Sequence, residues 1–409
     1  MASQEKFVVT ARYRNWTWGL IGAGLLALVV GFLMYGTGDE HHKTRFWAAL
    51  LHNSTYFLLV TNACMFFICA TTLAFGGWQM AFRRVAEAIA AAVPLIGIIT
   101  GVILLAIVFG GHHMTHIYHW TDTEAVNNDI ILKGKKPFLN TTFFTIWTIL
   151  TIGLWSVLGY KVRRISLDSD AGPMSVAEGK RYIWKNTVWA ALFIVWFALT
   201  VMSTVPWLWL MSIDAHWYST MYSWYTFAST WVAGLALLLL FVVYLKNHGY
   251  LEYTNREHIH DIGKFMFAFT IFWAYLWFSQ FMLIWYANIP EETVYFKPRT
   301  EGAYSGVFWL SFIINFLVPF VLLMKRSSKR NYSTITIMAL IIIFGHWLDF
   351  YQMVFASVAR DHVELNLFDI GIALGFVGLI MLVAGRAMSK HPLVAKYHPF
   401  TKESIIHHT

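Results

Sequence analysis

The chain has 409 residues, of which 58% are hydrophobic and only 13% are charged, and its formal net charge is +8. Because about a quarter of the residues in an average soluble protein are charged, this composition excludes a string of soluble domains and indicates a membrane protein. Two cysteines, Cys64 and Cys69, exclude a tetrathiolate zinc site or a cysteine-ligated iron–sulfur cluster within the chain. The sequence has none of the glycine-rich motifs of nucleotide-binding sites. The excess of Lys and Arg over Asp and Glu is explained better by membrane topology than by binding of nucleic acid.

Ten apolar runs are long enough to cross about 30 Å of hydrocarbon as helices. The sequence therefore predicts an all-α polytopic membrane protein with the short tails 1–16 and 387–409. In chain order, the predicted spans are 17–36, 47–75, 85–110, 141–160, 186–211, 226–246, 262–289, 304–324, 334–359 and 367–386.

The connections on the two sides of the predicted membrane differ in charge. Of the 30 Lys and Arg residues, 22 fall in the tails or in connections on the same side as the tails. Because cytoplasmic connections are enriched in Lys and Arg, both termini are predicted to be cytoplasmic. All connections are short, so catalytic machinery outside the membrane is expected to belong to partner chains.

A weak internal repeat relates two parts of the chain. The fourth span ends in LGYKVRRIS and the eighth in LLMKRSSKR, and both begin with aromatic-rich segments. The second to fifth spans (47–160 and 186–211) and the sixth to ninth spans (226–359) are therefore predicted to be two four-helix units of the same orientation. The first and tenth spans lie outside this repeat.

Two ionisable side chains fall near the middle of the ninth span, where burial in hydrocarbon makes them functional candidates. His346 and Asp349, in FGHWLDFYQM, are three residues apart and share one helix face. They can relay protons; alternatively, a neutral His346 bonded to Asp349 only stabilises packing. Glu87 and Lys264, at the starts of the third and seventh spans, extend the predicted proton path to the cytoplasm, unless they are interfacial side chains that snorkel.

Histidines mark the outer end of the third span, which reads GGHHMTHIYHW. His112, His116 and His119 would share one face if the helix continued. Histidine can donate to a quinone carbonyl and accept a proton from quinol, so His112 and His116 are predicted quinol-binding groups, together with His52 at the outer start of the second span. A contact surface for a partner is the alternative. A metal site would need a further ligand, and none is predicted.

The ten spans, the histidines of the outer face, the motif GHWLDFYQMV and the tail HPLVAKYHPFTKESIIHHT together resemble the F subunits of bacterial alternative complex III. Their wider relatives are the NrfD-like membrane subunits of polysulfide-reductase-type enzymes, and the resemblance covers essentially the whole chain. It implies two four-helix bundles flanked by the first and tenth helices, in the bacterial inner membrane. It also implies a subunit of a quinol:cytochrome c oxidoreductase that has no redox centre of its own.

The resemblance further implies partners. These are a homologous C subunit, an iron–sulfur protein, haem c subunits and, as a further expectation, a terminal oxidase. The haem c groups and iron–sulfur clusters would belong to those partners, and a quinol such as menaquinol would be the substrate of the complex. The chain itself would serve as a scaffold with a proton-conducting role.

Two other functions remain open. A standalone proton-coupled secondary transporter would use the same pair, His346 and Asp349. Such transporters commonly have broken helices in corresponding positions of their two halves, whereas Pro94, Pro206 and Pro319 fall in spans that do not correspond. A purely structural anchor for peripheral redox subunits would need no side chain of this chain for chemistry.

Overall fold

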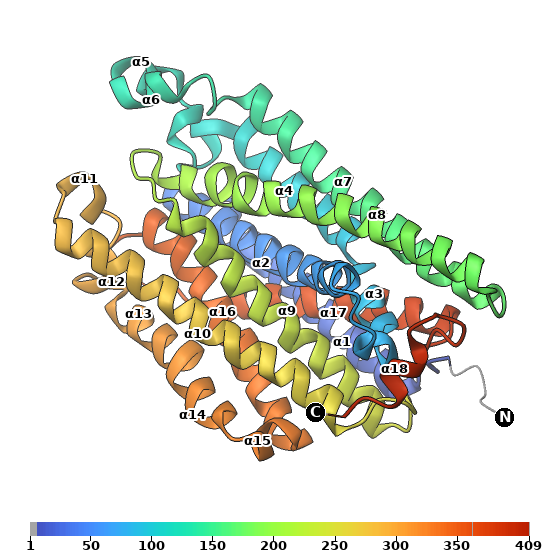
Figure 1. Ribbon diagram of the computed structural model, residues 1–409. Coiled ribbons are helices and arrows are strands. Elements are labelled where there is room, and N and C mark those ends of the chain that lie inside the picture. The colour runs from blue at the N-terminus through green and yellow to red at the C-terminus, as the bar shows by residue number, and fades with distance from the viewer. Residues whose placement is uncertain (1–5, 362, 409) are drawn as a thin grey trace.

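The computed structural model describes residues 6–361 and 363–408, apart from the side chains of residues 112–114. Every regular element of this described chain is helical, and ten helices are long and apolar enough to cross a membrane, as predicted. The long helices run side by side (Figure 1). We call the end that carries the two described chain ends, with α3, α15 and α18, the terminal face. The opposite end, with α5, α6 and α11, is the distal face.

The ten spans alternate in direction between these two faces. They are α1 (Ala11–Gly31) with the π-helical turn Phe32–Gly36, α2 (Glu40–Leu73), α3 (Arg83–Ala90) with α4 (Val93–Met114), α7 (Thr141–Asp168), α8 (Val176–Met202) with the π-helical segment Thr204–Leu210, α9 (Met221–Asn247), α10 (Arg256–Ala287), α13 (Ser305–Phe312) with α14 (Val318–Met324), α16 (Tyr332–Val358) and α17 (Leu367–Lys390). Short helices on the connections are α5 (Thr123–Asn128), α6 (Ile130–Lys135), α11 (Pro290–Thr293), α12 (Lys297–Thr300), α15 (Arg326–Arg330) and α18 (Thr401–Ile405).

Polar capping residues extend several helices beyond the apolar runs that predict them. Asp39 caps α2 by accepting a hydrogen bond from the backbone N–H of His42 at 3.0 Å, so this helix begins well before residue 47. Ser175 and Glu178 form a capping box at the start of α8. An apolar run marks only the part of a helix in hydrocarbon, whereas the cap fixes where the helix begins.

Three spans are interrupted near proline. The third span is divided into α3 and α4 just before Pro94. Pro206 lies within the π-helical segment Thr204–Leu210, and Pro319 follows the π-helical segment Ile313–Leu317. Proline removes a backbone donor and crowds the preceding turn. The interruptions affect the third, fifth and eighth spans, so they do not occupy equivalent places in the two halves.

The helices form two four-helix bundles. In the first bundle α2, α3 with α4, α7 and α8 pack in a ring, and in the second α9, α10, α13 with α14 and α16 do the same. α2 joins the bundles because it also packs against α9 and α16. A close approach at Gly234 allows this contact, since a Cβ atom there would lie 2.5 Å from the Cβ of Ala63. α1 and α17 pair beside α2, as the resemblance implies.

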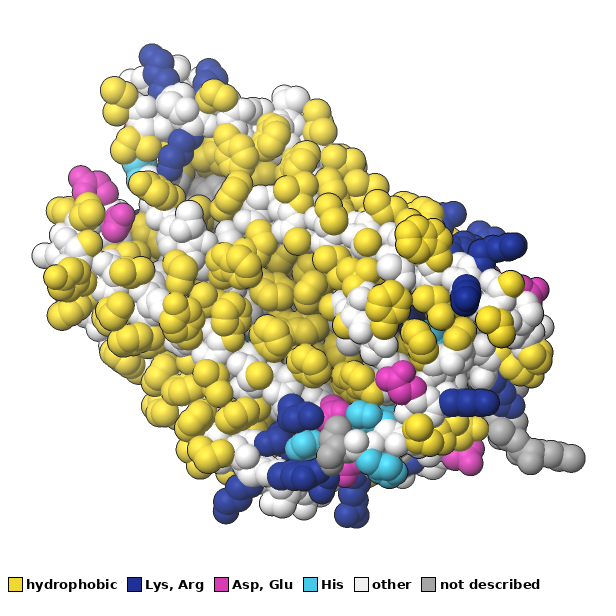
Figure 2. Space-filling view, in the orientation of Figure 1, with side chains coloured by type: hydrophobic (Ala, Val, Ile, Leu, Met, Phe, Trp, Pro, Cys, Tyr) yellow, Lys and Arg dark blue, Asp and Glu magenta, His cyan; other side chains and the backbone are white. Residues whose placement is uncertain are grey.

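The surface agrees with a position inside a membrane. On the side drawn in Figure 2, hydrophobic side chains cover the middle of the helices, and most Lys and Arg side chains gather toward the two ends. α2 and α9 are largely enclosed by other helices, whereas α1 is mostly exposed. Exposed apolar helix faces of this extent are stable in lipid rather than in water.

Candidate functional site

The most deeply buried ionisable pair lies on α16, in the core of the second bundle. His346 and Asp349 occupy one face of α16, and both side chains are 0% exposed. α16 packs against α9 at this level, and polar side chains of α9 and α10 surround the Asp349 carboxylate. His346 and Asp349 therefore share one face of α16, as predicted. The polar groups that surround them come from neighbouring helices as well as from α16.

Four neutral donors surround the Asp349 carboxylate. Oδ1 accepts hydrogen bonds from the Tyr225 hydroxyl and from Gln352 Nε2, the latter at 3.0 Å. Oδ2 accepts hydrogen bonds from Ser229 Oγ at 3.0 Å and from Trp273 Nε1 at 3.1 Å. No cation of the described chain pairs with Asp349. A buried carboxylate without a cation depends on such donors for its stability.

The Ser229 hydroxyl links Asp349 to His346. Its oxygen lies 3.0 Å from His346 Nδ1 and 3.0 Å from Asp349 Oδ2. The hydroxyl has a single proton. If Asp349 is ionised, Ser229 donates to it and accepts a hydrogen bond from His346 Nδ1–H. If Asp349 carries a proton, the carboxyl donates to Ser229, which then donates to His346 Nδ1. The three groups thus form a chain along which a proton can move.

The other ring nitrogen of His346 is available for a proton. Nε2 is buried and makes no hydrogen bond within the described chain. Asn315, in the π-helical segment of the eighth span, lies next to this region because its Nδ2 donates to the carbonyl of Gly345 at 3.0 Å. The Asn315 side-chain oxygen is also buried without a partner. Buried polar atoms of this kind are usual sites for an ordered water.

A small cavity lies on the distal side of Asp349. Its volume is about 10 Å³, and Tyr225, Gln280, Arg299 and Gln352 are among the residues that line it. The atoms Gln280 Nε2, Gln352 Oε1 and Arg299 Nε are buried and have no hydrogen-bond partner among the described residues. The cavity is thus polar and near the size that a single water requires.

Arg299, in α12 at the distal face, contributes a buried positive charge beside this cavity. Its side chain is only 2% exposed, and its guanidinium lies over the Tyr295 ring at 3.5 Å. It donates to the carbonyl of Tyr295 at 2.5 Å, to that of Gln352 at 3.0 Å and to Ser357 Oγ at 3.1 Å. No carboxylate of the described chain pairs with Arg299. Arg299 is therefore a buried cation on the wall of the cavity that Gln352 also lines.

Glu87 was predicted to extend the proton path or, alternatively, to be an interfacial side chain. It is not interfacial, because it is only 1% exposed where α3 lies beneath the C-terminal tail and beside α2 and α17. Its Oε1 pairs with Arg83 Nε at 2.8 Å. Glu87 and Asn62 line a cavity of about 120 Å³ at the break between α3 and α4. Within the part of the chain that the structure describes, Glu87 Oε2 and both amide atoms of Asn62 have no hydrogen-bond partner. This is a polar cavity of the first bundle, separate from that at Asp349.

Lys264 lies at the surface, as a snorkelling side chain would. Its Nζ is 2.7 Å from Asp261 Oδ1, and the side chain is about half exposed. Asp261 also contacts His407 of the C-terminal tail at 2.6 Å. Trp273, which contacts Asp349, is nine residues further along α10, a distance of about 13 Å. The structure therefore does not bring Lys264 into contact with the Asp349 site.

The outer histidines do not form one pocket. His52 was expected at the start of a helix, but α2 begins at Glu40, so His52 lies several turns inside it and is 0% exposed. His52 Nε2 donates to the carbonyl of Trp347 at 2.9 Å, at the contact between the two bundles.

The condition for aligning His112, His116 and His119, a helix that continues through them, is not met, because α4 ends at Met114. The His112 side chain lies outside the described part of the chain. His116 instead pairs with Glu40 at 2.8 Å, at the start of α2. A positive φ of 53° at Gly111 already departs from helical geometry near the end of α4.

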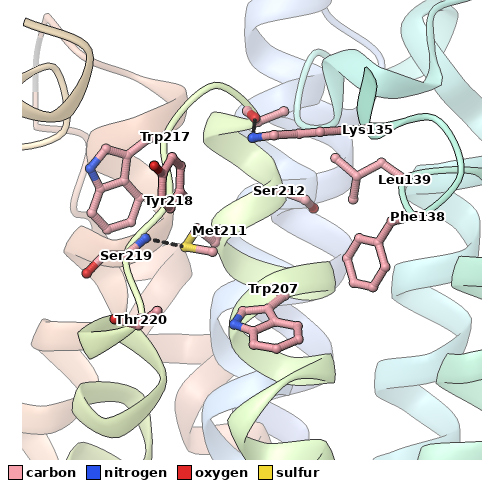
Figure 3. Close-up of a pocket in the computed structure, with 11 residues that line it drawn as sticks. Lys135, Phe138, Leu139, Trp207, Met211, Ser212, Trp217, Tyr218, Ser219 and Thr220 are labelled. Atoms are coloured by element: carbon pink, nitrogen blue, oxygen red, sulfur yellow. Dashed lines mark hydrogen bonds between the residues drawn. The ribbon is translucent and has the colours of Figure 1, made fainter. Parts of the chain in front are cut away.

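A separate pocket opens at the distal face between α6, the end of the fifth span and the connection to α9 (Figure 3). Its volume is about 310 Å³, and its walls are mainly apolar, with Trp207, Trp217 and Phe138 among them. Lys135 crosses the upper wall and donates to the carbonyl of Ala215 at 2.5 Å. Burial lowers the pKa of Lys135. Neither His52 nor His116 lines this pocket.

Sequence reasoning did not identify Ser229, Tyr225 or Arg299. Tyr225 and Ser229 are four residues apart in a strongly apolar span. This spacing places two polar side chains on one face of α9, and it could have indicated a polar contact with another helix. Arg299 lies in a short connection, where nothing in the sequence distinguishes a buried Arg from an exposed one. Within the described side chains, no group of three or more His, Cys, Asp or Glu residues is arranged to hold a metal ion.

The chain was compared with protein-family models and with curated proteins. No family model matches this chain, and no curated protein matches its sequence. The evidence for a function is therefore the buried site of the second bundle together with the pattern of the sequence.

Proposed function

We propose that this chain is an integral membrane subunit of a quinol-oxidising respiratory complex, in which it is a scaffold and conducts protons through its second bundle. The observation that carries the proposal is the buried chain Asp349–Ser229–His346. An ionisable pair in the core of a membrane protein is costly and is usually retained for function. A serine hydroxyl between the two groups gives them a direct route for proton exchange.

The proton step needs no redox group in this chain. A proton that reaches Asp349 from the cavity near Gln352 neutralises the carboxylate. The Asp349 proton then passes to Ser229 Oγ while Ser229 gives its own proton to His346 Nδ1. The resulting imidazolium loses its Nε2 proton toward Asn315, and Asp349 is left ionised. Arg299, whose guanidinium is buried on the wall of the same cavity, adds a positive charge where the proton enters.

The remaining parts of the proposal rest on the sequence. The excess of Lys and Arg in connections on the side of the tails supports cytoplasmic termini in a bacterial inner membrane. The resemblance supports partners that carry haem c and iron–sulfur clusters, including a homologous C subunit, with a terminal oxidase as a further partner. A quinol such as menaquinol would be oxidised by the complex, and this chain would couple proton movement to that reaction.

A standalone proton-coupled transporter is less well supported by the geometry. A transporter site must hold its substrate near the middle of the membrane. The cavity next to Asp349 has a volume of about 10 Å³, which suits a water molecule but not an organic solute. The helix interruptions near Pro94, Pro206 and Pro319 are also not paired between the two bundles.

The experiment that tests the complex is purification of the native protein in mild detergent, followed by a reduced-minus-oxidised visible spectrum of the material. We expect haem c bands that migrate with this chain on size exclusion, together with quinol-dependent reduction of those haems. A single polypeptide without haem absorbance, obtained in several mild detergents, would contradict membership of such a complex. Proton-coupled uptake assays would then test the transporter function.

A further inference from the structure

A basic cavity on the terminal face has no part in the proposed proton path. It lies where α10 and α16 begin, next to α15, and its volume is about 670 Å³. Arg256, Arg326 and Arg330 line it, together with polar residues at 327 and 331–333. Figure 2 shows Lys and Arg side chains gathered at this end of the molecule.

The cavity carries an excess of positive charge. The Glu257 carboxylate contacts Arg330 and lies 3.7 Å from Arg326. Arg256 is exposed and forms no ion pair or side-chain hydrogen bond with any described residue. The N-terminal ends of α10 and α16, two long helices, add their positive dipole ends at the same place. An anion bound here would therefore meet Arg256, which no carboxylate of the described chain neutralises.

An apolar surface leads away from this cavity into the membrane. α14 ends at Met324, two residues before Arg326, and the side chains of Val321, Leu322 and Met324 are exposed. On α16, Ile337 is exposed on the membrane side of the cavity. A small inorganic anion would use only the arginines. A lipid with a negatively charged headgroup would use both the arginines and the apolar helix surface below them.

We propose that this cavity binds the phosphate headgroup of an anionic phospholipid, with its acyl chains along α14 and α16. Arginine suits this ligand because its planar guanidinium can form two parallel hydrogen bonds to phosphate oxygens. Basic pockets between membrane helices are a general means of binding such headgroups. The bound lipid would hold the ends of α10, α14 and α16 together at the terminal face, independently of the proton path.

Native mass spectrometry of the detergent-purified protein tests this proposal with phosphatidylglycerol and phosphatidylcholine as probes. The variant is Arg256→Gln with Arg326→Gln, which leaves Arg330 to pair with Glu257. The wild type should retain phosphatidylglycerol in preference to phosphatidylcholine. The double variant should lose this preference by roughly thirty-fold, since it removes two surface cations that each contribute about 1 kcal/mol to the binding of anionic lipid. Binding of phosphatidylcholine should not change.

The matched control is Lys180→Gln with Arg181→Gln, which removes two exposed charges from α8 at the same end of the molecule but outside the cavity. This control should retain phosphatidylglycerol as the wild type does. Equal retention by the double cavity variant, or an equal loss in the control, would overturn the proposal. Displacement of the lipid by inorganic phosphate would overturn the lipid assignment.

If the cavity variant does not fold, a second measurement uses the wild type alone. Added salt should weaken its binding of phosphatidylglycerol, and a preference for phosphatidylglycerol that does not change with salt would refute the proposal.

Discussion

At the scale of single residues, one hydroxyl connects the two titratable groups in the core of the second bundle. Ser229 Oγ lies 3.0 Å from both His346 Nδ1 and Asp349 Oδ2. Without Ser229, Asp349 would keep its hydrogen bonds from Tyr225, Gln352 and Trp273. Removal of the hydroxyl should therefore interrupt proton transfer without unfolding the bundle.

We predict that Ser229→Ala slows proton transfer through the second bundle by at least ten-fold, because a methyl group cannot pass a proton. The loss of stability should be about 1 kcal/mol, the usual net contribution of one buried hydrogen bond. Proton uptake by reconstituted vesicles and a thermal unfolding scan would measure the two effects.

The matched control is Thr230→Val, one residue further along α9. The Thr230 hydroxyl donates only to carbonyls of its own helix, those of Thr226 and Phe227. This variant should conduct protons at the wild-type rate. Unimpaired transfer in Ser229→Ala would mean that Asp349 and His346 do not exchange protons through the serine.

The pair itself could be predicted from the sequence, but its surroundings could not. His346 and Asp349 are conspicuous because they interrupt an apolar span and share one face of it. The groups that complete the site come from α9, α10 and α12, and a single sequence does not reveal which residues of different helices meet. The error at His52 has a related cause: the apolar run began at residue 47, whereas the Asp39 cap starts α2 before it.

At the scale of elements, glycines allow α1 and α17 to approach each other closely. A Cβ atom on Gly375 would lie 2.9 Å from Gly24 Cα, and one on Gly24 would lie 2.4 Å from Gly375 Cα. Small residues at such contacts allow membrane helices to pack by van der Waals interaction along their backbones. The contact between α1 and α17 therefore depends on close van der Waals packing, and any larger side chain at Gly375 should separate the two helices.

We predict that Gly375→Val destabilises the protein by about 1–3 kcal/mol, the usual cost of overpacking a close contact. A lower midpoint of thermal unfolding in detergent would measure this effect. The control is Gly22→Val on α1, because a Cβ atom at Gly22 would meet nothing within 4 Å. Similar midpoints for the two variants would contradict the close packing of α1 against α17.

The sequence predicted the number and order of these elements from the lengths of their apolar runs. It also predicted the two four-helix units, from the weak repeat and from the resemblance. It did not predict that the third span would be divided before Pro94, nor that Glu87 would be enclosed. A proline permits several responses in a helix, and only the neighbouring helices determine which of them occurs.

At the scale of the whole molecule, the C-terminal tail connects the two bundles at the terminal face. Ser404 accepts a hydrogen bond from the backbone N–H of Ala81 at 2.9 Å and donates to the carbonyl of Trp78 at 2.6 Å. His407 contacts Asp261 of α10 at 2.6 Å. The tail therefore touches the start of the third span in the first bundle and α10 in the second.

We predict that acid weakens the docking of this tail through His398. Burial, followed by the charges of Arg83 and Arg84, lowers the pKa of His398 from its usual 6.5 to about 3. Between these two pH values the undocked tail binds more protons than the docked tail, so docking is strongest above pH 6.5 and weakens as the pH falls toward 3.

Limited proteolysis of the tail as a function of pH would measure this effect. His398→Gln should reduce the acid-induced increase in cleavage. His408→Gln, which changes an exposed histidine of the same tail, should leave it unchanged. An identical pH profile in wild type and His398→Gln would show that another group controls docking.

The central claim, that Asp349 carries protons for a quinol-oxidising complex, is tested most directly by the number of protons translocated per electron in reconstituted vesicles. The comparison is between the wild-type complex and one with Asp349→Asn, which keeps the shape of the side chain but cannot exchange a proton near neutral pH. We predict an assembled complex that still oxidises quinol but translocates fewer protons per electron. An unchanged ratio in an assembled Asp349→Asn complex would contradict the account and leave this chain as a structural anchor.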